Sequence, residues 1–278
     1  MNSDSKDIYL SIFDCSILIS TSSQHLQDIV SKIYGAFIIE LLIESPSLKY
    51  SLEMDSDSTI QIKRVGESQG LYTDDVSEFI FLLEKDMTIE LQKLRSDLFF
   101  LHSAALNYQG AGILLVAPSG SGKSTTAWAM INSGFDYLSD ELAPIDLNSM
   151  AIAPYPHALN LKADPPVFKL PEETLYTRHT IHVPIKEPSK NTATPLRAIF
   201  YLEFNNKISE PEITPISKAE ATACLYANSL NILAHGENDS GLNVAIKVAR
   251  HAKNYKLKSN DLEKTCKEVK LLMEALNL

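Results

Sequence analysis

The chain is poor in positive charge and in cysteine. Its 278 residues contain 25 Lys and Arg against 35 Asp and Glu, which gives a formal net charge of −10 at pH 7. A nucleic-acid partner would require a basic patch, so this balance argues against one, and any basic site must be local. Cys15, Cys224 and Cys266 are far apart and lack CxxC spacing. We therefore expect reduced, buried thiols in a cytoplasmic protein.

The chain also lacks a hydrophobic run that is long enough to span a bilayer. The apolar stretch 33–43 is too short and contains Glu40. Residues 1–7 carry acidic side chains and no basic cluster, so the apolar run 8–19 is expected to be a strand rather than a signal peptide. No membrane partner is therefore expected. The hydrophobic content of 45% is typical of a globular chain with one large or two modest domains.

Residues 1–74 are predicted to form a small α+β region. It should contain a helix that Ser22 or Ser23 caps and that reaches about residue 43, and strands at 8–19, 48–54 and 59–65. The last two strands are expected to pair as a hairpin around an Asp-rich turn. No residues here have the spacing of a metal site or a catalytic triad. The region either recognises a partner or serves only as a packing subdomain.

Residues 75–278 are predicted to form a larger α/β domain. Its first element is a helix at 75–97 with Asp75 and Glu78 as a capping pair, followed by a strand at 98–106 that carries His102. The remaining elements are expected to be a strand ending near 116, a helix at 124–132, strands at 135–138 and 198–204, helices at 217–233 and 243–252, a strand at 255–258 and a helix at 261–276.

The most informative stretch is an apolar run that ends in a glycine-serine loop. Residues 112–126 are GILLVAPSGSGKSTT, and 117–124 match the Walker A spacing except that Ala117 stands where the first glycine is usual. Gly120 and Gly122 would let successive backbone N–H groups converge on phosphate oxygens at the positive end of the following helix. The sequence therefore predicts a phosphate-binding loop between a strand and a helix.

This loop predicts a site for ATP and Mg²⁺. The residues expected to bind the nucleotide are Ser119, Gly120, Ser121, Gly122, Lys123, Ser124 and Thr125. Lys123 would supply a mobile positive charge. The hydroxyl of Ser124 would bind Mg²⁺, which prefers oxygen ligands and usually already bridges the nucleotide phosphates.

Asp140 follows the loop by only one predicted helix and one predicted strand. Because ligands of open α/β sheets bind beyond the carboxyl ends of the strands, Asp140 is expected to emerge beside the loop. An ABC-type ATPase would also need an LSGGQ-like signature, which the sequence lacks. A kinase needs only positioned phosphates, Mg²⁺ and a carboxylate that accepts the hydroxyl proton.

Three stretches, LHSAA at 101–105, the loop, and LSDEL at 138–142, resemble in order and spacing the C-terminal catalytic domain of HPr kinase/phosphorylase. They look still closer to HPr-kinase-like proteins found with peptide-modification systems, including kinases of lasso peptide precursors. The resemblance is tight over 101–145, looser further on and absent before about residue 75. It implies a mixed α/β nucleotide domain, similar also to that of phosphoenolpyruvate carboxykinase.

The resemblance also implies roles for individual residues. Lys123 would hold the β- and γ-phosphates, and Ser124 would bind the Mg²⁺ ion together with Asp140 and Glu141, the latter standing where the family has a second aspartate. Asp140 would be the base that takes the proton from a substrate hydroxyl, usually a serine. His102 would hydrogen-bond to Asp140 and tune its basicity.

The chain lacks the family's EIRGLG-type signature, so neither HPr as a substrate nor reversal by phosphorolysis is expected. The prediction is an ATP-dependent kinase that phosphorylates a hydroxyl, with a serine of a peptide or small protein as the leading acceptor. Two alternatives stay open: a non-catalytic ATP-binding module of a peptide-modifying complex, and a kinase of a small hydroxylated metabolite. Lys162 and Arg178 either neutralise the transferred phosphate or are simply solvated. Whether the chain forms a homo-oligomer is also left open.

Overall fold

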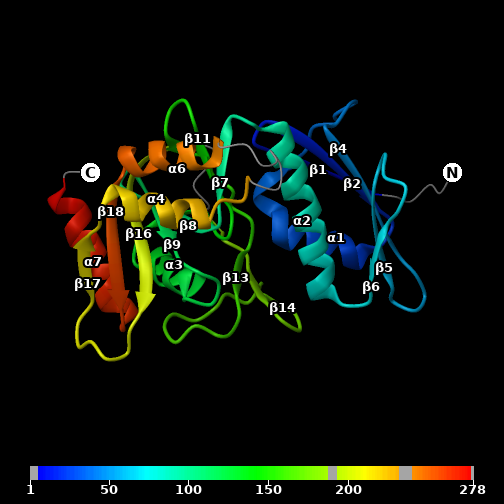
Figure 1. The fold of residues 1–278 in the computed structure, drawn as a ribbon. Helices are drawn as coiled ribbons and strands as arrows, with labels where there is room; N and C mark the ends of the chain where they lie inside the picture. The colour runs from blue at the N-terminus through cyan, green and yellow to red at the C-terminus, as the bar shows by residue number, and fades with distance from the viewer. Residues whose placement is uncertain (1–5, 187–192, 232–239, 277–278) are drawn as a thin grey trace.

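The structure, a computed structural model, describes residues 6–186, 193–231 and 240–276. A small sheet with its helices lies at one end of the molecule, and a larger sheet between helices forms the other end (Figure 1). The predicted mixed α/β class is confirmed. Cys15 and Cys266 are buried, Cys224 is half-buried, and all three are free thiols.

The small sheet has six strands in the order β3-β1-β2-β4-β5-β6. The strands are β1 (Lys6–Ile12), β2 (Cys15–Thr21), β3 (Ile38–Ile39), β4 (Leu48–Met54), β5 (Ile60–Arg64) and β6 (Leu71–Thr73). The predicted hairpin of the second and third strands is confirmed as β4 and β5, which pair antiparallel through Leu52 and Ile62. Its turn is held by Asp55, whose Oδ1 accepts hydrogen bonds from the N–H groups of Asp57 and Thr59.

The prediction of one strand over residues 8–19 is wrong, because this run is a hairpin of β1 and β2. Phe13 and Asp14 form a two-residue turn with φ angles of 50° and 60°. Two left-handed residues match the twist of a tight hairpin. Buried residues alternate at Leu10 and Ile12 and again at Cys15, Ile17 and Ile19, so the alternation shifts by one position at the turn. The turn contains neither glycine nor proline, so the two residues that most strongly mark turns gave no signal of it.

Helix α1 (Gln24–Tyr34) begins where predicted but ends early. The hydroxyl of Ser23 accepts a hydrogen bond from the N–H of Leu26 at 3.4 Å, as expected of an N-cap. The prediction that the helix reaches residue 43 is wrong, since a 3-10 turn, η1 (Gly35–Phe37), leads into β3, which pairs with β1. Strand pairing therefore overrides the local apolar pattern here.

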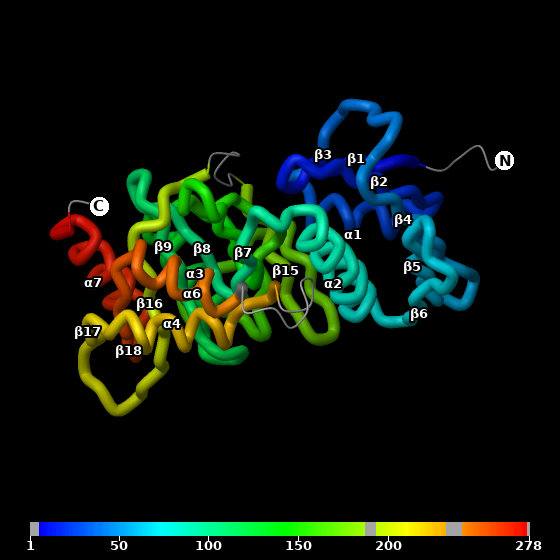
Figure 2. Tube along the Cα trace, turned by 45° about the horizontal axis from the view of Figure 1, so that its top comes forward, coloured from blue at the N-terminus to red at the C-terminus, as the bar shows by residue number. Residues whose placement is uncertain are grey.

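Helix α2 (Val76–Leu94) joins the small sheet to the rest of the chain. Asp75 caps it by accepting a hydrogen bond from the N–H of Glu78 at 3.0 Å. Its buried residues Phe79, Leu83 and Met87 share a hydrophobic core with the small sheet, although the sequence assigned this helix to the second region. The same core contains Tyr155 and Ala158 from the larger part, and Figure 2 shows α2 lying between the two.

The larger sheet has nine strands, of which β9, β16 and β18 run parallel at its centre. Its strands are β7 (Leu98–Leu101), β8 (Ser103–Tyr108), β9 (Ala111–Val116), β10 (Asp136–Ser139), β11 (Ala143–Asp146), β12 (Ala151–Ile152), β16 (Thr194–Phe204), β17 (Glu212–Pro215) and β18 (Lys253–Ser259). A third, three-stranded sheet is formed by β13 (Leu159–Leu161), β15 (Ile181–Val183) and β14 (Leu175–Tyr176).

Helices cover both faces of the larger sheet (Figure 1). Ile113 and Leu115 of β9 pack in one core with α3 (Lys123–Asn132) and α7 (Leu262–Ala275). Leu114 and Val116 pack in another with α4 (Lys218–Ala227) and α6 (Ser240–His251). Successive side chains of a strand point to opposite faces, so a continuous apolar run is what a strand buried on both sides requires. Helix α4 ends short of the predicted position near residue 233, which lies outside the described residues.

The prediction of a single strand at 98–106 is also wrong. The chain leaves the β7 ladder at His102, whose N–H donates to the carbonyl of Asn228 at 2.8 Å, and continues as β8 in another ladder. β7 pairs with β11, whereas β8 pairs with β9 and β10. His102 therefore sits at a bend between two strands.

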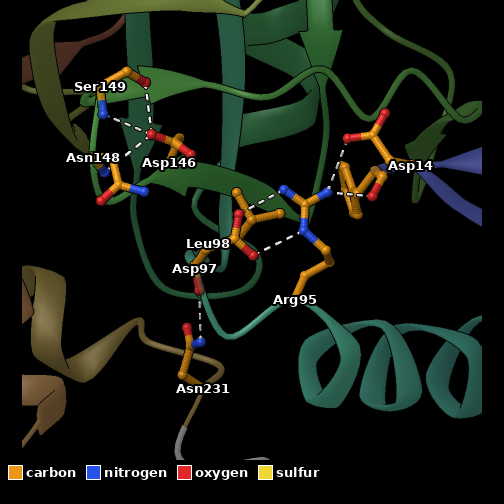
Figure 3. Close-up of polar contacts among 9 residues, drawn as sticks. Asp14, Arg95, Asp97, Leu98, Asp146, Asn148, Ser149 and Asn231 are labelled. Atoms are coloured by element: carbon orange, nitrogen blue, oxygen red, sulfur yellow. Dashed lines mark hydrogen bonds and ion pairs between the residues drawn. The ribbon is translucent and has the colours of Figure 1, made fainter.

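Arg95, the C-cap of α2, links the small sheet to the start of β7 (Figure 3). Its guanidinium donates two hydrogen bonds to Asp97, at 2.8 and 2.6 Å, and another to the carbonyl of Phe13 in the β1–β2 turn. The bond to Arg95 holds the pKa of the Asp97 carboxyl below its usual value. On the other side of β7, Asn231 bonds the backbone of Leu98 and Phe100.

We expect Arg95→Leu to lower the free energy of unfolding by about 1–3 kcal/mol, because it leaves a carboxylate and a carbonyl without their donor. Urea denaturation would measure the loss. Lys93→Ala is the matched control: Lys93 lies in the same helical turn, is half exposed and, among the described residues, pairs with Glu90 alone. Its change should stay below about 0.5 kcal/mol. An equal effect of both substitutions would contradict a linking role for Arg95.

Candidate functional site

Three predicted site segments leave the larger sheet at one edge. β8 runs antiparallel to both β9 and β10, with Ser103 opposite Val116 and Ala105 opposite Ser139. The carboxyl ends of β9 and β10 therefore lie beside the amino end of β8. This edge brings the 117–122 loop, His102 and Asp140 together. The loop and Asp140 were expected to meet because both follow the carboxyl ends of strands.

The 117–122 loop connects β9 directly to α3. Gly120 and Gly122 have φ angles of 83° and 86°, a left-handed conformation that side chains disfavour, and Gly122 is the N-cap of α3. Ala117, the irregular position of the motif, is not among the residues with positive φ, so its methyl group causes no strain. The first turn of α3 has no side-chain cap, which leaves its N–H groups for a ligand.

The ammonium group of Lys123 is folded back over this loop. It donates a hydrogen bond to the carbonyl of Ala117 at 2.8 Å, and the residue is only 6% exposed. Burial lowers the pKa of Lys123, and the negative charges of Asp140 and Glu141 oppose this effect. The ammonium therefore lies between the loop carbonyls and the two carboxylates.

Asp140 is fully buried and incompletely bonded. Its Oδ2 accepts a hydrogen bond from the N–H of Asn160 at 3.3 Å, while Oδ1 has no hydrogen-bond partner among the described residues. Burial raises the pKa of Asp140, opposed by the Ser124 hydroxyl and the charge of His157. A buried carboxylate oxygen without a partner, near a serine hydroxyl, is a donor set that suits Mg²⁺.

Glu141 has a strained backbone and a side chain that the surrounding protein covers only in part. Its φ angle of 65° is left-handed, a conformation that costs a non-glycine residue about 1 kcal/mol or more. Its Oε2 accepts a hydrogen bond from Nδ2 of Asn160 at 3.3 Å. Partial burial raises the pKa of Glu141, and the negative charges of Asp140 and Glu84 raise it further.

Asn160, in the middle of β13, is a site residue that the sequence did not predict. Besides its bonds to the two carboxylates, its Oδ1 lies 2.7 Å from Nδ1 of His182 on the paired strand β15. Burial lowers the pKa of His182 to about 4. Because the amide oxygen of Asn160 can only accept, Nδ1 of His182 is the donor in this bond. The bond fixes which way the amide of Asn160 faces.

The predicted hydrogen bond between His102 and Asp140 is not present. His102 is half-buried, and its pKa is lowered by burial and by the positive charges of Lys123 and Lys162. The histidine whose charge acts on Asp140 is His157, which is 1% exposed and lies with Nε2 2.9 Å from the carboxylate of Glu84. Because Glu84 belongs to α2, spacing along the chain could not reveal this pair.

His157 is a second buried positive charge, besides Lys123, in this acidic region. Burial lowers its pKa, but the carboxylates of Glu84, Glu141 and Asp140 outweigh this and raise it to about 9. A histidine with a raised pKa stabilises the fold most below its unfolded pKa of about 6.5, and this stabilisation is lost as pH rises through about 9. The ring of Tyr155 packs against the imidazole of His157, with 4.9 Å between the ring centroids.

We therefore expect the free energy of unfolding to fall between pH 6.5 and 9 by more in the wild type than in His157→Gln, by about 3 kcal/mol at most. Urea denaturation at several pH values would give the two profiles. Subtracting them removes the groups that titrate in both proteins. Parallel profiles would mean that His157 is not charged in the folded chain.

Three cavities meet at the loop. A phosphate-sized cavity of about 160 Å³ is lined by Lys123, Ser124, Glu141 and Lys162, and we call it the central cavity. A second, of about 510 Å³, shares Gly120, Gly122 and Thr125 with it and extends towards the ends of β16 and β18. We call this one the β16–β18 cavity.

The third cavity, of about 450 Å³, extends from the opposite end of the central one and is lined largely by α2; we call it the α2 cavity. It shares His102, Ser119, Glu141, Asn160, Lys162 and Thr180 with the central cavity. Asp140 is absent from the lining of both, so of the two carboxylates Glu141 faces the cavities and Asp140 lies behind.

The two basic residues of the sequence analysis have different places. Lys162 is exposed, donates to the Ser119 hydroxyl at 3.3 Å and lines two of the cavities. Arg178 lies 3.9 Å from Asp75 at the start of α2 and is largely exposed. The structure therefore brings Lys162 to the loop and leaves Arg178 in an open groove beside α2.

Within residues 6–186, 193–231 and 240–276, no group of three or more His, Cys, Asp and Glu side chains is arranged to hold a metal by itself. A nucleotide-bound Mg²⁺ needs only one or two protein carboxylates. Within the same ranges, no helix has both the length and the apolar character needed to cross a membrane.

Neither a protein-family model nor a curated protein matches the chain. Among solved structures it is similar to the Hpr(Ser) kinase/phosphatase from Coxiella burnetii, with 12% sequence identity over 64% of this chain and 94% of that one. The TM-score is 0.31.

Proposed function

We propose that the chain is an ATP-dependent kinase that transfers a phosphoryl group to a hydroxyl. The observation that carries this proposal is the line of three cavities, with the loop and Glu141 in the walls at its middle. The end cavities share residues with the central one but differ in their walls. Two ligands could therefore bind end to end, with the transferred group between them.

The nucleotide phosphates would lie in the central cavity. The backbone of the 117–122 loop, the first turn of α3 and the Lys123 ammonium would bind their oxygens. Ser124 and Asp140 would hold Mg²⁺, which when bound neutralises charge on the phosphates and orients them. The unpartnered Oδ1 of Asp140 supports this role.

The acceptor would enter from the α2 cavity, where Glu141 is in the wall. We propose that Glu141 takes the hydroxyl proton as the acceptor oxygen bonds to the γ-phosphorus and the bond to the β-phosphate oxygen breaks, releasing ADP. The base is therefore Glu141 in this proposal, whereas the resemblance implied that Asp140 is the base. The reason is that Asp140 lies behind Glu141 and next to Ser124. The raised pKa of Glu141 favours proton acceptance.

A peptide or small protein suits the acceptor side better than a metabolite. The α2 cavity shares Ser77, Phe81 and Thr180 with an open groove of about 530 Å³ at the start of α2, so a longer ligand has room to continue. Supplying γ-labelled MgATP with either a pool of serine peptides or a pool of hydroxylated metabolites would test this. Labelled peptides support the proposal, and labelled metabolites alone would overturn its acceptor. Bound ATP that is returned unchanged with both pools would indicate a non-catalytic nucleotide-binding module.

A further inference from the structure

We propose that the chain phosphorylates its own Thr180, the residue that precedes strand β15. This inference rests on the proposed function, because it assumes that the nucleotide phosphates occupy the central cavity and that Glu141 accepts the hydroxyl proton. It adds a modification site, with an acceptor hydroxyl that belongs to the chain itself.

The register of the three-stranded sheet turns the side chain of Thr180 towards the site. β13 and β15 pair antiparallel with Asn160 opposite His182. Continuing this register by two positions places Lys162 opposite Thr180. Residues two positions apart on a strand point to the same face of the sheet. The Thr180 side chain therefore shares a face with that of Asn160, which donates a hydrogen bond to Glu141.

A tight turn fixes the backbone of Thr180 and leaves its hydroxyl free. The carbonyl of Thr180 accepts hydrogen bonds from the N–H of Thr177 at 3.0 Å and from the Thr177 hydroxyl at 2.7 Å. The same hydroxyl lies 3.1 Å from that of Ser77 on α2. Within the described ranges no hydrogen bond involves the hydroxyl of Thr180, and its oxygen is not among the covered polar atoms that lack a partner. This oxygen is therefore accessible to a reactant.

Thr180 lies where the acceptor hydroxyl is expected. It lines the central cavity of about 160 Å³ together with Lys123, Ser124 and Glu141. Because this cavity is phosphate-sized, a group in its wall lies close to whatever fills it. Thr180 also lines the α2 cavity, from which the acceptor is proposed to enter, whereas the 117–122 loop would hold the leaving phosphates on the other side. A hydroxyl held in this place has the proximity that transfer requires.

The reaction needs no reactant besides MgATP. The Oγ1 atom of Thr180 bonds to the γ-phosphorus as the bond from that phosphorus to the β-phosphate oxygen breaks, and ADP leaves with the bonding electrons. The hydroxyl proton passes to the carboxylate of Glu141. Lys123 and Lys162 line the same cavity, so their ammonium groups would partly neutralise the new phosphate.

Incubation of the full chain with γ-labelled MgATP and no peptide tests this inference. We expect a single acid-stable phosphate, which tandem mass spectrometry locates on Thr180. Its rate should not depend on protein concentration, because the hydroxyl and the site belong to the same chain. Thr180→Val and Thr180→Ser are the matched pair, since valine keeps the shape and serine keeps the hydroxyl. The valine variant should lose the label, and the serine variant should carry it at position 180.

The outcomes separate this inference from the proposed function. If the wild-type chain labels serine peptides but not itself, or carries its label on Ser77 or Thr88 of the α2 cavity, the inference fails while the kinase stands. A labelling rate that rises with protein concentration would mean transfer between chains and would also overturn it. If Thr180→Val does not fold, the position of the label in the wild type decides. If neither peptides nor chain are labelled, the proposed function fails as well.

Discussion

Lys123→Ala should reduce the affinity of the chain for MgATP by about 100-fold or more, equivalent to about 2.7 kcal/mol. The ammonium lies at the loop mouth, held by the carbonyl of Ala117 and facing Asp140 and Glu141. Its removal leaves the phosphates beside two carboxylates without the cation that separates them. A buried ammonium acts on phosphate far more strongly than one in water, because little solvent screens it. Calorimetric titration with MgATP gives the affinity directly.

Lys162→Ala is the matched control for this experiment. Lys162 also approaches the loop, but it is exposed and donates to the Ser119 hydroxyl at 3.3 Å. Solvent and salt weaken its contribution, so we expect a loss of about 10-fold or less. Urea denaturation of both variants would show whether the fold is kept. Unchanged MgATP binding in a folded Lys123→Ala protein would contradict a phosphate site on this loop.

Glu141→Gln should reduce phosphoryl transfer by about 10²- to 10⁴-fold while leaving MgATP affinity within a few-fold of the wild type. The substitution keeps the shape of the side chain in the cavity wall and removes its capacity to accept a proton. Because the lost interaction forms only as the hydroxyl attacks, kcat should fall without a matching change in nucleotide affinity. Single-turnover transfer assays combined with nucleotide titration separate the two quantities.

Asp140→Asn is the companion variant, and it should behave differently. If Asp140 acts with Ser124 at the metal, its loss should weaken MgATP binding more than the binding of ATP without magnesium. If Asp140→Asn binds MgATP normally but transfers no phosphoryl group, while Glu141→Gln stays active, Asp140 and not Glu141 is the base. This is the role that the resemblance implied for Asp140.

The predicted strand, loop and helix around the 117–122 loop needed only local information. The apolar run of β9, the two glycines and the helix after them are signals of neighbouring residues, and the structure follows them closely. The predictions failed where the chain turns inside an apolar run. At Phe13 and Asp14 the turn contains neither glycine nor proline. At His102 the bend is held by the carbonyl of Asn228, far along the chain.

The sequence predicted the site residues that belong to recognisable motifs. It missed the residues that other elements, distant along the chain, bring to the site. Asn160 and His157 lie in a proline-punctuated segment without spacing of their own. Their partners are His182 on β15 and Glu84 on α2. No pattern along the chain joins these four positions, since strand pairing and the packing of α2 bring them together. The same packing makes α2 a wall of the α2 cavity and ties the N-terminal region to the site.

The fate of the γ-phosphate tests the central claim most directly. The wild-type chain would be incubated in excess over γ-labelled MgATP with the pool of serine peptides. We predict that the label moves to an acid-stable, alkali-labile phosphoester, that ADP forms in equal amount, and that Glu141→Gln slows both. Label that remains in ATP, or that appears only as inorganic phosphate at the same rate with and without the peptides, would contradict a hydroxyl kinase.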